Sequence, residues 1–385
     1  MKLNLSSLAF ALFIAVPFLL SGQSNTATSS APTGTTLGSN DTIAYEGIAL
    51  TNRVKLRGYV DFIYGYGDLD EIVDDSRFST AADMDFLFDF SPVTGEIHLR
   101  SSDTNGIELE QAYARYSFNQ DFNLSFGRQL TSLSYEADEA PGLFAVSKGY
   151  FMDAIREHNA LQSAYGEIAS AFNKSTTAIS SSLSTDASKV ESAIPQLRRN
   201  YVDGIRGNFN NGMVGITLGL HDGYWLSDHF NDNAAIDVAA SVMIIPGLEA
   251  RLGYAHQDCD STSIDDIGHV NAWIEFNPGD LTLALEYDHF DFGDDSDSDL
   301  WDIMFLLNYQ FVDWFGATLR YSHEDFEDIA GLLDLDYESD RITLAFLFSI
   351  TNNLALNFEF THTEIDIAGE DVDADEFYVE GLFTF

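Results

Sequence analysis

The feature that most constrains the fold is an alternation of apolar and polar residues that recurs in many separate segments. Residues 281–288 read Leu-Thr-Leu-Ala-Leu-Glu-Tyr-Asp, and residues 354–361 read Leu-Ala-Leu-Asn-Phe-Glu-Phe-Thr. Because successive side chains of a β-strand point to opposite faces, each segment predicts a strand with one apolar and one polar face. Many such strands, joined alternately by short and long connections, are typical of a transmembrane antiparallel β-barrel.

The number of strands bears on the width of that barrel. The alternation predicts 16 strands, at residues 54–66, 82–90, 94–101, 106–118, 121–131, 200–209, 212–222, 234–244, 248–258, 267–277, 280–290, 299–310, 313–323, 338–349, 352–363 and 375–385. Tight turns rich in Asn, Gly and Pro join alternate pairs, at 91–93, 119–121, 210–212, 246–247, 277–279, 311–313 and 351–353. Bacterial outer-membrane barrels sort their turns and loops in this way, and 16 strands leave a water-filled channel.

The first residues predict export. Residues 1–22 begin with Met-Lys, continue through an apolar core and end in small residues, as in a cleaved signal peptide. Residues 23–53 are rich in Ser, Thr, Gly and Ala and predict a flexible lead-in. The barrel is expected over 54–385, and the predicted location is the bacterial outer membrane.

Acidic residues dominate the charge of the chain. The formal net charge of −44 argues against nucleic acid as a partner. Many of the acids gather at 68–75, 258–266, 294–299, 324–340 and 364–376, in or beside the longer predicted connections. Two interpretations stay open: a solvated acidic surface, or a negative vestibule that enriches cations. Four acids of one run offer hard oxygen ligands that suit Ca²⁺: Asp294, Asp295, Asp297 and Asp299. No other cofactor is expected.

The phase of the alternation predicts which charges face the channel. An Arg or Lys on the lipid face near the midplane costs about 2–4 kcal/mol, so charged residues should face inward. The predicted pore-lining residues are Arg57, Asp61, Glu96, His98, Arg100, Glu249, Arg251, Glu286, Arg320, Arg341, Glu359 and Glu380. Such residues set the ion preference of a channel, or they pair with one another as structural salt bridges.

Two strands depart from the alternation. In 106–118, Ile107 and Leu109 share their phase with Gln111 and Arg115, which predicts a β-bulge or a change of face. In 121–131, Arg128 follows the apolar row and is expected beyond the edge of the bilayer.

The connection at 132–199 is far longer than the others. Apolar residues within 150–199 recur mostly at three- and four-residue spacing, which predicts one or two amphipathic helices. One interpretation is that the apolar stripe of these helices simply packs against another surface. The second hypothesis is that the insert folds into the barrel and narrows the pore.

Several short stretches resemble the OmpL-like family of outer-membrane β-barrel porins. They are Leu-Glu-Gln-Ala-Tyr at 109–113, Phe-Gly-Arg at 126–128, Tyr-Glu at 135–136, Leu-Gly-Leu at 218–220 and Asp-Gly at 222–223. Ser134 stands where that pattern usually has Gly. The resemblance implies a porin for small solutes without enzymatic activity. The last strand also resembles the signal that barrel-assembly machinery reads, carried by Phe377, Val379, Phe383 and Phe385.

Three classes of function can be compared. The leading interpretation is a porin for passive diffusion of ions and small hydrophilic solutes, favouring cations. The alternative is a structural or surface-binding barrel whose acidic loops bind divalent ions. An outer-membrane hydrolase would need a serine with a placed histidine, and the histidines are scattered. The expected partners are outer-membrane lipid, the barrel-assembly machinery and small solutes. Two states of the chain stay open, a monomer and a homotrimer.

Overall fold

The computed structural model describes residues 47–69, 73–102, 106–151, 153–154, 197–225, 234–258, 266–292, 299–327, 336–367 and 370–385. The strands are β1 Ile48–Ala49, β2 Val54–Leu69, β3 Val73–Phe90, β4 Val93–Ser102, β5 Ile107–Ser117, β6 Phe122–Leu130, β7 Tyr201–Asn210, β8 Val214–Asp222, β9 Ala234–Ile245, β10 Leu248–Asp258, β11 Asp266–Phe276, β12 Leu281–Asp291, β13 Asp299–Val312, β14 Phe315–Glu327, β15 Tyr337–Thr351, β16 Leu354–Ile367 and β17 Glu370–Thr384. A 3₁₀ turn, η2, spans Ala140–Gly142. Within these ranges no helix is long and apolar enough to cross a membrane.

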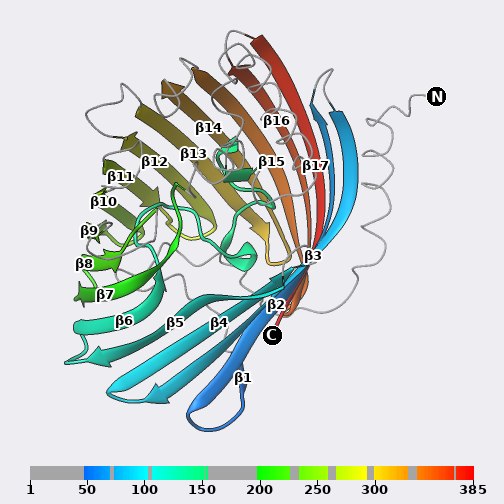
Figure 1. Ribbon diagram of the computed structural model, residues 1–385. Coiled ribbons are helices and arrows are strands. Elements are labelled where there is room, and N and C mark those ends of the chain that lie inside the picture. The colour runs from blue at the N-terminus through cyan, green and yellow to red at the C-terminus, as the bar shows by residue number, and fades with distance from the viewer. Residues whose placement is uncertain are drawn as a thin grey trace.

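The sheet closes on itself. Each strand from β2 to β17 pairs antiparallel with the next, and β17 returns to β2 with Val379 opposite Tyr64. Figure 1 shows the red β17 beside the blue β2. The short β1 pairs only with the start of β2, so the barrel wall has 16 strands. The predicted transmembrane antiparallel barrel of 16 strands is therefore confirmed.

The outer face of the wall is apolar. Alternate residues along the strands point outward and are exposed, among them Leu252 at 61%, Leu218 at 62% and Phe305 at 40%. At the tight-turn end, aromatic rings cluster around the β13–β14 turn, where Phe311 lies 5.3 Å from Phe315 and Trp314 lies 6.3 Å from Phe348 between ring centroids. An apolar band with an aromatic girdle is the surface that a bilayer requires.

The predicted tight turns are present at all seven positions between paired strands. Asn211 shows the chemistry of these turns, since its Oδ1 accepts hydrogen bonds from the amides of Met213 and Val214. The neighbouring Gly212 has a φ of +83°, a conformation that glycine adopts without a steric penalty.

At the opposite end the strands are longer than the sequence indicates. Much of 68–75, 324–340 and 364–376 was expected to be acidic connection, but β2, β3 and β14 to β17 continue into these stretches. The misreading has a physical cause, because the alternation is inverted there. Apolar side chains such as Phe326 and Ile365 point inward, while acids such as Glu327 and Glu364 are exposed outside. Of the acids described in these stretches, Glu327 and Glu364 lie on the outer surface, whereas Glu324 and Glu376 are buried inside the barrel.

The irregularity predicted in 106–118 is a β-bulge. His98 of β4 pairs with Gln111 and Leu99 pairs with Leu109, which leaves Glu110 as the extra residue of β5. Both Glu110 and Gln111 are buried as a result, at 5% and 3% exposure. The bulge therefore adds a carboxylate to the interior that simple alternation would not place there.

A charge on the outer face should test the membrane assignment. Leu252 lies at the middle of β10, so Leu252→Arg should lower the free energy of unfolding in lipid by about 2–4 kcal/mol. Met213→Arg, at an exposed turn, should cost about 0–1 kcal/mol by the same reasoning. Denaturant titration of both variants in lipid vesicles measures the difference, and equal costs would contradict the assignment.

Candidate functional site

The candidate site is the interior of the barrel, which is occupied by the connection between β6 and β7. Figure 1 shows this insert, in teal and green, running inside the wall. Its described parts, 131–151 and 197–200, touch strands on opposite sides of the barrel. The Tyr135 amide donates to Glu286 of β12 at 2.5 Å, and Glu139 lies 3.5 Å from His98 of β4. The hypothesis that the insert folds into the barrel agrees with these contacts.

One side of the insert is held by charges of β14 to β16. Glu359 accepts hydrogen bonds from the backbone amides of Val146, at 2.5 Å, and Ser147, at 3.0 Å. Arg320 donates to the carbonyls of Ser147 and Lys148, both at 2.9 Å, and forms an ion pair with Glu136 at 2.5 Å. The wall therefore satisfies backbone groups that an irregular segment would otherwise leave buried and unpaired.

A second set of contacts between insert and wall is made by Arg198, near the C-terminal end of the insert. Arg198 forms ion pairs with Asp302 at 2.5 Å and Glu324 at 3.2 Å, and it also binds Asp153 of the insert at 2.8 Å. Its guanidinium lies 3.8 Å from the ring centroid of Tyr150. Opposite charges raise the pKa of Arg198 against the effect of its burial, so it remains a cation.

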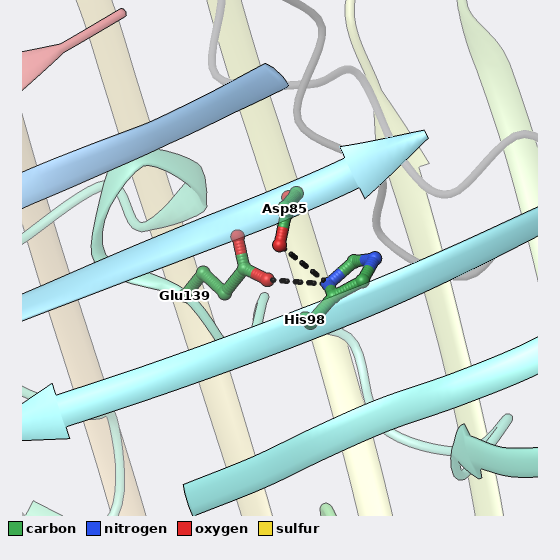
Figure 2. Close-up of side chains that lie close together, drawn as sticks. All are labelled: Asp85, His98 and Glu139. Atoms are coloured by element: carbon green, nitrogen blue, oxygen red, sulfur yellow. Dashed lines mark ion pairs between the residues drawn. The ribbon is translucent and has the colours of Figure 1, made fainter. Parts of the chain in front are cut away.

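A third anchor is a cluster around His98 (Figure 2). The Nδ1 atom of His98 lies 3.0 Å from Asp85 and 3.5 Å from Glu139, and its Nε2 atom lies 3.1 Å from Glu96. Arg57 pairs with Asp85 at 2.7 Å. Burial raises the pKa of the Glu139 carboxyl to about 7, against the opposing effect of the hydrogen bond with His98. Carboxylates surround the imidazole on both of its nitrogens, as expected for a protonated ring.

The structure places the predicted pore-lining residues on the inner wall. Eleven of the twelve are buried, and the twelfth, Arg100, is half-exposed beside Glu110 at 3.5 Å. Salt-bridge formation, the other interpretation, also occurs. Within the predicted set, Glu96 lies 3.1 Å from His98 and 3.9 Å from Arg57. The shorter ion pairs of Arg57, Arg320 and Arg341 are made with Asp85, Glu136 and Glu376, which lie outside that set.

Carboxylates outnumber cations in this interior. Among the described residues, eighteen Asp and Glu side chains are buried, against eight of Lys and Arg. Several of these acids accept hydrogen bonds from the insert or from neighbouring side chains. Glu286, for example, accepts from the backbone amide of Tyr135 at 2.5 Å and from the side-chain amide of Asn271 at 2.9 Å. The described interior therefore holds more than twice as many Asp and Glu as Lys and Arg side chains.

The residues that sequence reasoning missed belong mainly to the insert. Glu136, Glu139, Ser147 and Arg198 make the contacts to the wall, and none has a periodic signal. Asp83 and Asp85, by contrast, alternate within the predicted strand 82–90 and could have been assigned to the lumen by the same phase argument.

Several predicted features lie outside the described residues. These are the signal peptide, most of the lead-in, the helical part of the insert at 155–196, and Asp294, Asp295 and Asp297. Asp299 begins β13, partly exposed, with a carboxylate oxygen 3.7 Å from His289. Three described groups have metal-ligand spacing: Asp85, His98 and Glu139; Asp83, Glu110 and Glu139; and the more exposed His323, Glu338 and Asp340.

The last strand closes the wall. Phe377, Val379 and Phe383 lie on the outward side of β17, and the backbone of Phe385 exchanges hydrogen bonds of 2.9 and 3.0 Å with Gly58. Their role as an assembly signal stays a prediction. Ser134, at the position where the resembled pattern usually has Gly, has a φ of +80°, in the region that glycine adopts most readily.

Comparison with known proteins places the fold among porin-type outer-membrane β-barrels. No protein-family model and no curated protein matches the chain. Among solved structures, the outer membrane channel DcaP of Acinetobacter baumannii matches with a TM-score of 0.57 and 13% identity, over 88% of this chain and 99% of that one. An anion-selective porin from Comamonas acidovorans matches with a TM-score of 0.57 and 15% identity, over 86% and 99%. OprB of Pseudomonas putida matches at 0.57 and 12%, over 86% and 94%.

Removing the Arg320 guanidinium should loosen the insert while the wall persists. Arg320→Gln leaves the Glu136 carboxylate buried without its partner, which costs about 3–5 kcal/mol of insert docking. Hydrogen exchange at the amides of Val146 and Ser147 should accelerate accordingly. The matched control is Arg128→Gln, which removes an exposed ion pair with Asp203 and should cost less than about 1 kcal/mol. Equal protection in both variants would contradict this anchoring.

Proposed function

We propose that the protein is an outer-membrane porin through which ions and small hydrophilic solutes diffuse passively. The observation that carries the proposal is a closed barrel of 16 strands with an apolar outer face and a charged interior. Barrels of this strand number enclose aqueous channels. The insert then acts as the constriction that sets the width of the pore. The assignment to the OmpL-like family, the cleaved signal peptide, insertion by assembly machinery and a homotrimeric state belong to the same proposal.

The channel favours cations in this proposal. Support comes from the excess of buried carboxylates over Lys and Arg among the described residues. Fixed charge along a narrow path raises the local concentration of the opposite ion. Exposed acids at the strand ends, such as Glu327 and Glu364, contribute less, because they lie on the outer side of the wall.

Conductance through planar bilayers tests the channel and the role of the insert together. Leu130 and Tyr201 are partners across β6 and β7, so a short turn can replace residues 131–200 without straining the wall. The intact protein should give stable openings, and the shortened protein should give openings of clearly larger conductance. Equal conductance would remove the insert from the pore path. No opening in either form would favour the alternative, a structural or surface-binding barrel.

Reversal potentials in a KCl gradient test the cation preference. Asp61→Asn with Glu380→Gln removes two inward carboxylates and should reduce the ratio of potassium to chloride permeability. Glu364→Gln with Asp366→Asn removes two exposed outer carboxylates of β16 and should leave the ratio nearly unchanged. An anion preference in the unmodified protein would sink the proposed selectivity.

A further inference from the structure

We propose that Asp83, Glu110 and Glu139 form a calcium site that ties the insert to the barrel wall. The three carboxylates come from three different segments. Asp83 points inward from β3, Glu110 is the extra residue of the β5 bulge, and Glu139 is the residue that precedes η2 in the insert. One oxygen of each lies within 4.8 Å of the other two.

The unpaired state of these oxygens points to a missing cation. Asp83 is 2% exposed, and neither of its carboxylate oxygens has a hydrogen-bond donor. The same holds for Oε2 of Glu110 and Oε2 of Glu139. Buried carboxylates are normally paired or bound to a metal, because burial of an uncompensated charge is costly. One oxygen from each of the three side chains lies within 4.8 Å of the others, so a single cation could bind all three carboxylates.

The charge balance of the surrounding cluster agrees with a divalent ion. The contacts around His98 and Glu110 join five carboxylates: Asp83, Asp85, Glu96, Glu110 and Glu139. The cations among them are Arg57, Arg100 and the protonated His98. When all five carboxylates are ionised, these groups carry two more negative than positive charges, and one Ca²⁺ ion would neutralise that excess.

The neighbouring group with His98 is a poorer site (Figure 2). Both ring nitrogens of His98 lie at hydrogen-bond distance from carboxylates, so the imidazole has no lone pair to offer a metal. The set of Asp83, Glu110 and Glu139 supplies oxygen alone, which is the ligand type of hard cations.

The test is calorimetric titration of the folded protein in detergent with CaCl₂, after treatment with a chelator. One site per chain is expected, and Asp83→Asn or Glu139→Gln should weaken binding at least about tenfold because each removes a ligand charge. Glu139→Gln lies in the insert and leaves the wall pairing intact, so it remains informative if Asp83→Asn fails to fold. Asp299→Asn is the matched control from the acidic surface run and should bind as the unmodified protein does.

Three results would overturn the site. They are the absence of Ca²⁺ binding, binding that survives both lumen substitutions but is lost in Asp299→Asn, and tight binding of Zn²⁺ alone that depends on His98. Binding in detergent needs no ion flow, so this outcome is independent of whether the barrel conducts.

A second readout tests the tie between wall and insert. At equal ionic strength, 1 mM CaCl₂ should raise the melting temperature of the unmodified protein above that measured in KCl, and Glu139→Gln should abolish the increment. A calcium-dependent increment that persists in Glu139→Gln would show that the ion binds without holding the insert, which contradicts the proposal.

Discussion

Closure of the sheet is the constraint on which the rest of the structure depends. Hydrocarbon offers no partner to a backbone amide, so a membrane-spanning sheet must have no free edge. Here the pairing of β17 with β2 removes both edges, and Phe385 and Gly58 complete the seam with two backbone hydrogen bonds. Once the wall is closed, each strand has one face toward lipid, and its charged residues have only the interior to occupy.

The interior of a 16-stranded barrel is wide, and the described parts of the insert place irregular backbone inside it. Irregular backbone at membrane depth is tolerated only where protein or water satisfies its polar groups. Charged side chains of the barrel interior form the hydrogen bonds that these backbone groups need. Arg320 and Glu359 bind carbonyls and amides of 146–148, and Arg199 donates to the carbonyls of Thr131, Ser134 and Glu136. The same side chains that would set ion preference in the proposed channel therefore hold the insert in place, so the two roles cannot be separated at Arg320 or Glu359.

The sequence predicts the wall far better than it predicts the interior, for physical reasons. A period of two is a local signal, and it placed the turns, the strand number and the inward phase of residues such as Glu286 and Arg341. It failed at the ends of β14 to β17, because outward acids with inward apolar residues read like acidic loops. The contacts of the insert are long-range: Ser147 and Arg320 are 173 residues apart in the chain, and no local pattern marks them as partners. Residues 155–196 lie outside the described residues, so the predicted helices there stay a prediction.

The inverted ends of the strands separate two properties of the interior, its apolar surface and its charge. Phe290, Phe292, Phe326 and Tyr337 belong to an apolar cluster inside this end of the barrel, and Phe151 and Leu197 of the insert pack into it. An apolar constriction opposes every ion through loss of hydration, whatever the sign of its charge. In the proposed channel, charge discrimination would fall to the buried carboxylates, which exceed Lys and Arg among the described residues. A porin described as anion-selective has the same fold at 15% identity, so the fold leaves selectivity open and the inner side chains decide it.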